Sequence, residues 1–363
     1  MQRNLLILCG GRSAEHEVSL VSARNILTAL DKEQYTPHVV LISRDGQWLY
    51  LPHWQDIETL KAVPSTLPKA AICSLMRVGQ QVYIINETGV KQVIDLAFPV
   101  LHGPMGEDGT IQGMFEVLGL PYVGSGVLSS AVAMDKLYSK MAFAAAGLPI
   151  APYFALSADE VKPTFNDAQK RLTTEIVFVK PAVMGSSVGV SKVRTQEQWD
   201  KALRLAFSYG SKVIVEAMVV GREVECAVLG GEQPKASILG EIRPTHDFYS
   251  YESKYLDPNG AELIVPAPLS EKHTTMVQQL AIKAFQALSC AGMARIDFFF
   301  CEDGRAIVNE ANTIPGFTSI SMYPMLWQNS GMTYSGLISK LLELALSEFA
   351  AKQVVSTDHL LAV

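Results

Sequence analysis

Cysteine is scarce in the sequence, and the positions of the few cysteines exclude two kinds of site. The 363 residues include five cysteines, which lie far apart and form no CxxC pair. A disulfide framework and a zinc site both depend on ordered cysteine pairs, so the sequence indicates neither. Most of the five lie in apolar runs, where burial in the core is the usual role of a free cysteine.

Long apolar runs and an excess of positive charge are missing as well. The apolar run at residues 5–9 stops at Gly10-Gly11 and is too short for the core of a secretory signal. No stretch approaches the roughly 20 apolar residues that cross a bilayer. The formal net charge of −6 gives no electrostatic reason to expect nucleic acid or an anionic membrane as a partner. We therefore expect a soluble, cytoplasmic protein.

Composition and length indicate an ordered protein with more than one domain. Hydrophobic residues make up 48% of the chain and charged residues 18%, a balance typical of globular rather than disordered proteins. At roughly 150 residues per domain, the length predicts two or three domains.

The N-terminal part has the pattern of an α/β domain that ends near residue 125. Residues 4–9 predict a buried strand, a glycine pair follows, and residues 13–30 show the apolar spacing of a helix. A strand, a glycine turn and a helix in this order open a Rossmann-like fold. Prolines interrupt residues 50–92, where we expect an irregular insertion, and residues 93–102 predict a single strand.

Two polar segments of this domain are candidates for ligand contact. The loop at residues 102–109 is too rich in glycine and in polar residues for core packing, and it follows a strand end, where α/β domains bind ligands. Glu15 and His16 lie at the start of the first predicted helix. The carboxylate of Glu15 there is either a simple cap for the helix or a ligand contact.

Two strands near the C-terminus carry the strongest cluster of polar side chains. The segments MARIDFFF and AIVNEAN predict neighbouring strands joined by a tight turn. Side chains two apart share a face of a strand, so Arg295 lies with Asp297 and Glu310 lies with Asn312. Oxygen ligands of these types suit a hard cation such as Mg²⁺. The alternative is a solvated face with a surface ion pair, which the apolar surroundings disfavour because buried charges need partners.

A glycine-serine loop and several lysines are candidates for phosphate contact. Residues 184–189 follow a strand that ends in Lys180, and amide and hydroxyl donors of such a loop can surround phosphate oxygens. No GxxxxGK[ST] motif occurs, which excludes a P-loop, and an ordinary hairpin turn is the alternative. Lys136 and Lys140 lie one turn apart on a helix that Asp135 caps. This pair is either a solvated face or, through Lys136, a phosphate contact.

Glutamates beside a chain crossover are the last candidates. Glu216 ends an apolar strand, and Glu223 and Glu225 begin another. Acceptors at such a crossover suit adenine N6–H and ribose hydroxyl groups, whereas any one of these glutamates taken alone is more commonly a surface residue.

Taken together, eight ordered motifs resemble the D-alanine–D-alanine ligases of the ATP-grasp superfamily, over nearly the whole chain. Eight motifs in one order are far more specific than any of them alone. They are GGRSAEHEVSL (10–20), HGPMGEDGT (102–110), MDKLYSK (134–140), VKPAVMGSSVGVSKV (179–193), VEAMVVGREVECAVLG (215–230), FYSYESKY (248–255), MARIDFFF (293–300) and NEANTIPGFTSISMYP (309–324).

This resemblance implies a fold class and a division of the chain. It implies an α/β and α+β protein, in which an N-terminal Rossmann-like (pre-ATP-grasp) domain at residues 1–125 precedes a two-subdomain ATP-grasp fold. The central subdomain would cover residues 126–220, and the C-terminal subdomain would cover residues 221–363.

The resemblance also implies ATP and two Mg²⁺ (or Mn²⁺) ions as the bound cofactors. The metal ligands would be Asp297, Glu310 and Asn312. The residues implied to contact ATP are Lys136 and Lys180 at the phosphates, Lys254 over the phosphates, and Glu216, Val219 and Glu223 at the adenosine.

The remaining implied site residues serve two molecules of D-alanine. The substrate-binding set is Glu15 at the ammonium of the first D-alanine, Arg295 and the amide of Gly316 at the oxyanion, Ser321 at the carboxylate of the second D-alanine, and His102. The catalytic set is Arg295 with a hydrogen-bonded group, Glu15, Ser186 and Tyr255, that closes a loop over the site.

The implied reaction is ligation of two D-alanine molecules through D-alanyl phosphate, for peptidoglycan precursor synthesis, by a homodimer. One alternative is another carboxylate–amine ligase or a D-alanyl-D-lactate ligase, against which Tyr255 and Ser321 argue. A second alternative is a non-catalytic ATP-binding regulator, against which the intact metal-binding set argues.

Overall fold

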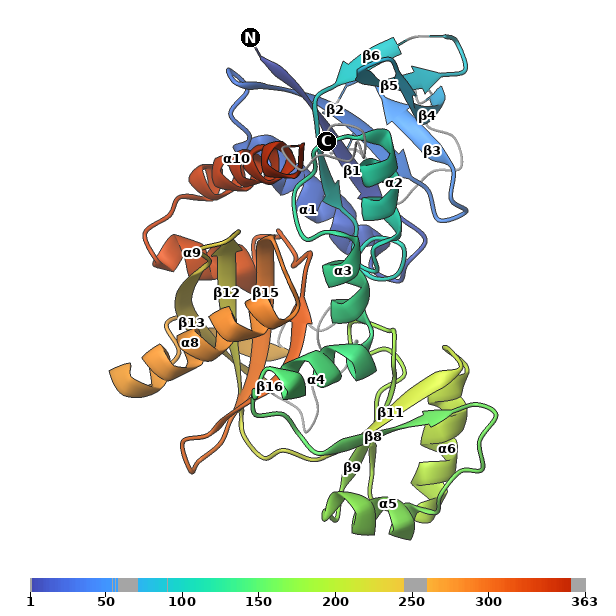
Figure 1. Cartoon of the computed structure of the whole chain (residues 1–363), viewed down its shortest axis with the longest axis vertical. Coiled ribbons are helices and arrows are strands. Elements are labelled where there is room, and N and C mark those ends of the chain that lie inside the picture. The colour runs from blue at the N-terminus through green and yellow to red at the C-terminus, as the bar shows by residue number, and fades with distance from the viewer. Residues whose placement is uncertain are drawn as a thin grey trace, which may run out of the picture.

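Three β-sheets with flanking helices make up the computed structural model, which describes residues 2–53, 55, 57, 71–89, 91–244 and 260–353. Figure 1 shows the N-terminal sheet at the top, the C-terminal sheet in the middle and the central sheet at the bottom. None of the helices in these ranges is long and apolar enough to cross a membrane.

The N-terminal sheet is built around a parallel core. Strand β1 (Arg3–Gly10) pairs in parallel with β2 (Tyr35–Ile42) and with β7 (Leu96–Val100). Its near-continuous apolar sequence follows from burial on both faces. Helix α1 (His16–Ala29) covers one face and α2 (Thr110–Leu118) covers the other. The strand, glycine turn and helix expected at the start of the chain are confirmed.

Antiparallel strands extend this sheet where the sequence predicted an irregular insertion. The strand order is β6-β5-β4-β3-β2-β1-β7, and the added strands are β3 (Trp48–Leu51), β4 (Ala71–Val78), β5 (Gln81–Asn86) and β6 (Lys91–Ile94). The prediction was wrong for residues 71–94, because alternating side chains such as Leu75 and Ile84 bury one face of a hairpin. The single strand expected over residues 93–102 is two strands, separated at Asp95, whose carboxylate accepts the amide hydrogen of Asn4.

The C-terminal helix returns to the N-terminal sheet. Helix α10 (Tyr334–Gln353) packs beside α1, as Figure 1 shows, and it also contacts β7. Its buried side chains, among them Leu337 and Leu341, share one core with Leu5 and Ile7 of β1. Strand β1 and helix α10 therefore contribute to the same hydrophobic core, and the division at residues 125 and 220 remains a prediction.

Two helices connect the N-terminal sheet to the rest of the molecule. Helix α3 (Val127–Met134), which the sequence did not predict, runs into α4 (Lys136–Ala145). Asp135 caps α4, as predicted: its side chain accepts hydrogen bonds from the amides of Leu137 and Tyr138. The chain turns away after α4 at Gly147, whose φ is +67°.

The central sheet is antiparallel, in the order β10-β9-β11-β8. Its strands are β8 (Tyr153–Ser157), β9 (Val177–Pro181), β10 (Ser191–Val193) and β11 (Lys212–Ala217), and its helices are α5 (Phe165–Leu172) and α6 (Gln196–Phe207). The helix expected from about residue 159 begins at Phe165, because Thr164 and Asp167 form a capping box there.

The C-terminal sheet is antiparallel as well, in the order β14-β13-β12-β15-β16. Its elements are β12 (Arg222–Gly230), β13 (Lys235–Pro244), β14 (Ala261–Ile264), α8 (Glu271–Ala287), β15 (Gly292–Phe300), β16 (Ala306–Asn312) and α9 (Met322–Asn329). Helix α8 buries one face of the sheet and α9 covers one end of the other. The rest of that second face carries the charged residues described below. The sequence predicted neither β13 nor α9.

Replacing Asp135 separates the contribution of the helix cap from that of an ion pair. Its carboxylate also lies 2.9 Å from Nζ of Lys212. We expect Asp135→Ala to lower the free energy of unfolding by about 1–2 kcal/mol, because two amides at the start of α4 lose their acceptor. Asp135→Asn keeps an acceptor and loses only the ion pair, so we expect a smaller loss. Urea denaturation measures both, and equal losses would contradict the capping role.

Candidate active site

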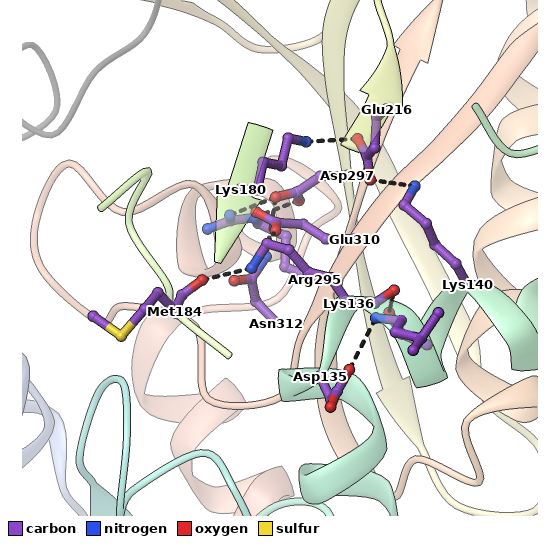
Figure 2. Close-up of polar contacts among 12 residues, drawn as sticks. Asp135, Lys136, Lys140, Lys180, Met184, Glu216, Arg295, Asp297, Glu310 and Asn312 are labelled. Atoms are coloured by element: carbon purple, nitrogen blue, oxygen red, sulfur yellow. Dashed lines mark hydrogen bonds and ion pairs between the residues drawn. The ribbon is translucent and has the colours of Figure 1, made fainter. Parts of the chain in front are cut away.

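The hairpin of β15 and β16 places four polar side chains on one face of the C-terminal sheet. Asp297 lies opposite Glu310, and Arg295 lies opposite Asn312. The guanidinium of Arg295 donates two hydrogen bonds of 2.7 Å to Asp297, and the Asn312 amide donates one of 3.0 Å to the same carboxylate. Figure 2 shows these residues meeting at the centre of the site. The shared face predicted from the sequence is confirmed.

Burial separates this cluster from a solvated surface ion pair. The side chains of Arg295 and Asp297 are 21% and 14% exposed. Nε of Arg295 also lies 3.0 Å from the carboxylate of Glu225 on the neighbouring strand β12. Burial alone would lower the pKa of Arg295, but Asp297 and Glu225 raise it above the usual value. The guanidinium is therefore a fixed positive charge in this face of the sheet.

The side chains of Asp297, Glu310 and Asn312 fit a hard divalent cation. They supply carboxylate and amide oxygens, which are the ligands that Mg²⁺ and Mn²⁺ prefer. The hydrogen bonds from Arg295 and Asn312 do not exhaust Asp297, because an ionised carboxylate has about four acceptor positions. The donor set on this face is thus consistent with the metal site that the sequence predicted.

Three lysines face this hairpin from the central sheet and from α4. Lys136 donates a 2.5 Å hydrogen bond to the carbonyl oxygen of Met184, and its Nζ lies 3.9 Å from Glu310. Lys140 and Lys180 both pair with Glu216, at 2.9 Å and 2.7 Å. A solvated face for Lys136 and Lys140 is excluded, because their side chains are 13% and 2% exposed.

The charges in this group shift one another's pKa values in opposite directions. Burial lowers the pKa of Lys136, although Glu310 opposes that effect. Burial would raise the pKa of Glu216, but Lys140 and Lys180 outweigh it and hold the value at about 2. Burial would lower the pKa of Lys180, but Glu216 raises it above the usual value. Glu216 is consequently ionised at neutral pH.

The glycine-serine loop connects β9 to β10 and reaches the N-terminal domain. Ser186 and Ser187 have φ values of +52° and +59°, a left-handed conformation that is uncommon outside glycine. The hydroxyl of Ser186 donates a 2.5 Å hydrogen bond to the carboxylate of Glu15. The loop is therefore more than an ordinary hairpin turn, and it brings together two residues that the family resemblance places in one hydrogen-bonded group. Tyr255, the third member of that group, lies outside the described residues.

A second carboxylate, that of Glu107, lies beside Glu15; the sequence predicted ligand contact for its loop, residues 102–109, but no role for this residue. The amide of Gly103 donates a 2.8 Å hydrogen bond to Glu107, and a Cβ added to Gly103 would lie 3.1 Å from the Glu15 carboxylate. The two acidic groups thus flank one glycine. Burial, with a further contribution from Glu15, raises the pKa of Glu107 to about 8.

His102 links the N-terminal domain to the loop that carries Gly316. Its Nδ1 lies 3.0 Å from the carbonyl oxygen of Ile314, so Nδ1 carries the proton and Nε2 accepts from the hydroxyl of Ser22 at 3.3 Å. Ser22 accepts in turn from the amide of Phe317 at 3.1 Å. Burial lowers the pKa of His102 and keeps the ring neutral. Both ring nitrogens have partners, so this geometry makes His102 a residue that positions the loop.

Gly316 and Ser321 lie together at the start of α9. A Cβ added to Gly316 would lie 2.7 Å from Oγ of Ser321, so a side chain at this position would displace the serine. The Ser321 hydroxyl is held by Thr318, whose amide donates to it at 2.9 Å. Helix N-termini attract carboxylates, because their amides and the helix dipole both favour negative charge.

The remaining predicted site residues lie near the crossover between β11 and β12 or outside the described ranges. Val219 packs beside Ile307 and Ala151 in a small apolar cluster. Glu223 lies on β12 two residues before Glu225, on the same face of the sheet as the Arg295 cluster. Lys254 lies outside the described residues.

Comparisons with known proteins identify the family. Two family models match the chain: the D-ala D-ala ligase N-terminus over residues 4–125 and the D-ala D-ala ligase C-terminus over residues 142–343. The chain belongs to the D-alanine–D-alanine ligase family. The resemblance predicted from the eight motifs is confirmed, as is a Rossmann-like domain followed by an ATP-grasp fold.

Individual relatives agree with this assignment. D-alanine–D-alanine ligase A of Salmonella typhimurium is 45% identical over 360 residues, which cover 97% of this chain and 98% of that protein. The structure of the D-alanine-D-alanine ligase from Coxiella burnetii matches with a TM-score of 0.87 at 38% identity, covering 97% and 96% of the two chains. The VanG D-Ala:D-Ser ligase from Enterococcus faecalis matches with a TM-score of 0.83 at 31% identity, covering 95% and 100%.

The raised pKa of Glu107 predicts a pH dependence of stability. A carboxyl group whose pKa rises from 4.5 to about 8 on folding favours the folded state fully below 4.5 and loses this contribution as the pH rises toward 8. Glu107→Gln keeps an uncharged acceptor at every pH. We therefore expect the melting temperature of the native protein to fall, relative to that of Glu107→Gln, across this window. A difference that is constant with pH would mean that Glu107 does not titrate there.

Proposed function

We propose that the protein joins two D-alanine molecules to D-alanyl-D-alanine at the site between the three sheets, with the residue roles given below. As a D-alanine–D-alanine ligase, it is an ATP-dependent enzyme of peptidoglycan precursor synthesis that acts through a D-alanyl phosphate intermediate. One observation carries the assignment of the site. The hairpin cluster, the lysines of α4 and β9, and the Glu15–Ser186 pair converge from separate parts of the chain.

The nucleotide side of the proposed site lies between the central and C-terminal sheets. Lys136, Lys180 and Lys254 bind the phosphates of ATP, while Glu216, Val219 and Glu223 line the adenosine. Asp297, Glu310 and Asn312 hold two Mg²⁺ or Mn²⁺ ions, which offset the negative charge that gathers during phosphoryl transfer. The positions of Lys136 beside Glu310 and of Lys180 beside Glu216 support this arrangement.

The amino acid side of the proposed site lies toward the N-terminal domain. Glu15 binds the ammonium of the first D-alanine, and Ser186, with Tyr255, orients that carboxylate by hydrogen bonding. Arg295 and the amide of Gly316 stabilise the oxyanion. Ser321, at the positive end of α9, receives the carboxylate of the second D-alanine. His102 does not contact the substrate in this proposal. It hydrogen-bonds to Ile314 and Ser22 and so fixes the loop that carries the Gly316 amide.

The proposed chemistry has two steps. A carboxylate oxygen of the first D-alanine attacks the γ-phosphorus of ATP, so that ADP leaves and an acyl phosphate forms. The neutral amine of the second D-alanine then attacks the acyl carbon, and the charge on the tetrahedral oxygen develops beside Arg295. Collapse of this species forms the peptide bond, releases phosphate and gives up the proton of the amine. We also propose a cytoplasmic homodimer, which the family resemblance supports.

Phosphate release with a panel of second substrates tests the proposed function. We expect release from ATP with D-alanine and Mg²⁺ and little release with L-alanine, because Glu15 fixes the ammonium group and Arg295 fixes the carboxyl group of the first D-alanine, while the α9 N-terminus fixes the carboxylate of the second. Mass spectrometry of the products should show D-alanyl-D-alanine, with D-serine and D-lactate as competing acceptors. Equal turnover of L-alanine would contradict the stereospecific site, and a preference for D-serine would reassign the second substrate.

Replacing Glu310 tests the metal site. Glu310→Gln keeps the size of the side chain and removes one anionic ligand, so we expect turnover at saturating ATP to fall by about a hundredfold. The fall should shrink at high Mg²⁺ concentration. Glu302→Gln, at the exposed turn of the same hairpin, is the matched control and should retain activity. Near-normal turnover of Glu310→Gln at low Mg²⁺ would remove Glu310 from the metal site.

A further inference from the structure

The carboxylate of Glu216 is held between two lysines, and the two lysines differ in their surroundings. Lys140 reaches Oε1 at 2.9 Å and Lys180 reaches Oε2 at 2.7 Å, as Figure 2 shows. The side chains of Lys140 and Glu216 are 2% and 4% exposed, whereas that of Lys180 is 13% exposed. The two cations thus share one buried anion, although a single cation is enough to neutralise it.

Lys140 is fixed in place by the helix that carries it. It lies on the buried side of α4, which packs through Phe143 into the core beneath the C-terminal sheet. Its Nζ also lies 5.8 Å from the centre of the Tyr153 ring, where a cation is attracted to the aromatic face. Lys140 therefore has no other anionic partner among its described contacts and remains beside Glu216.

Lys180 stands at the edge of the proposed nucleotide site. It lies at the end of β9, next to the glycine-serine loop. The negative charges of Glu216, Glu310 and Glu223 all raise its pKa. A lysine that binds phosphate as a point charge must leave, or at least share, its carboxylate partner. If Glu216 had no second cation, that move would leave a buried carboxylate unpaired, which is strongly unfavourable.

We propose that Lys140 is a positioning residue, the permanent counter-ion of Glu216, which allows Lys180 to exchange this carboxylate for the phosphates of ATP. The inference rests on the proposed function, in which Lys180 binds the phosphates and Glu216 lines the adenosine. It adds a role for Lys140, to which the proposed function assigns no contact with nucleotide. The ion pair between Lys180 and Glu216 is then the arrangement before ATP binds. The charge of Lys140 determines how easily Lys180 separates from Glu216.

The role of Lys140 predicts a loss confined to the phosphate part of nucleotide binding. In Lys140→Met, Glu216 keeps Lys180 as its sole counter-ion. We expect affinity for the Mg²⁺ complex of adenylyl-imidodiphosphate to fall by about tenfold or more, while affinity for adenosine changes by less than about threefold. KM for ATP should rise more than kcat falls. Lys140→Arg restores a buried cation and should recover most of the affinity.

Removing the charge of Glu216 provides the decisive comparison. In a Glu216→Gln background the buried anion is gone, so Lys140 has nothing to neutralise. Adding Lys140→Met to Glu216→Gln should leave the ratio of analogue to adenosine affinity unchanged within about twofold. Glu216→Gln alone leaves Lys140 buried without its anion, whereas the double variant removes both charges of this pair. The double variant is therefore compared with the native protein where a single variant folds poorly.

Isothermal titration calorimetry of the four variants and the native protein distinguishes the outcomes. Parallel losses of analogue and adenosine affinity in Lys140→Met, with a lowered melting temperature, would make Lys140 a structural residue and overturn the proposal. The proposal would also be overturned if adding Lys140→Met to Glu216→Gln lowered the ratio of analogue affinity to adenosine affinity further. Failure of the native protein to bind the analogue would instead overturn the proposed function itself.

Discussion

The antiparallel register of β15 with β16 is the constraint on which the site depends, and a β-bulge sets that register. Phe298 lies opposite Val308, but the next pair is Asp297 with Glu310, so Asn309 is an extra residue in β16. Strict alternation would place Val308, Glu310 and Asn312 on one face. The bulge turns Val308 into the core and leaves Glu310 and Asn312 beside Asp297 and Arg295. Bulges beside active sites re-aim side chains in this way.

Charge compensation is the second condition that the site meets. Each strongly buried charge described here is paired: Glu216 with two lysines, and Arg295 with Asp297 and Glu225. Such pairs add little net stability, because removing two charges from water costs about as much as their attraction returns. These ion pairs instead hold the charged groups in fixed positions, at the place where a phosphate-bearing substrate binds. Shared partners, such as Glu216, let one cation change its contact without leaving another charge buried alone.

The sequence was most informative where the local structure depends only on neighbouring residues in the chain. The cap at Asp135, the shared face of Arg295 and Asp297, and the strand and glycine turn before Glu15 all follow from short-range rules. The motifs then identified the family, because eight segments in one order are specific even where each alone is not.

The sequence was least informative where position depends on distant chain segments. The strands over residues 71–94 were missed, because their buried alternation is brief and prolines precede it. The sequence left the pairing of Lys140 with Glu216 and the burial of Glu107 unpredicted, since both depend on contacts that no local pattern encodes. For the same reason, the sequence did not predict the hydrogen bonds of the His102 ring nitrogens with Ser22 and Ile314, and the substrate role that the resemblance implies for His102 stays a prediction.

Phe317 shows why the amino acid side of the site is tied to the N-terminal domain. Its ring is fully buried, 5.8 Å from the centre of Phe98 on β7 and 5.8 Å from that of Tyr323 on α9. The backbone around it is held by Asn25 and Ser22 of α1, and by the hydroxyl of Tyr334 of α10. The loop that presents Gly316 is thus part of the N-terminal core, although β16 before it belongs to the C-terminal sheet.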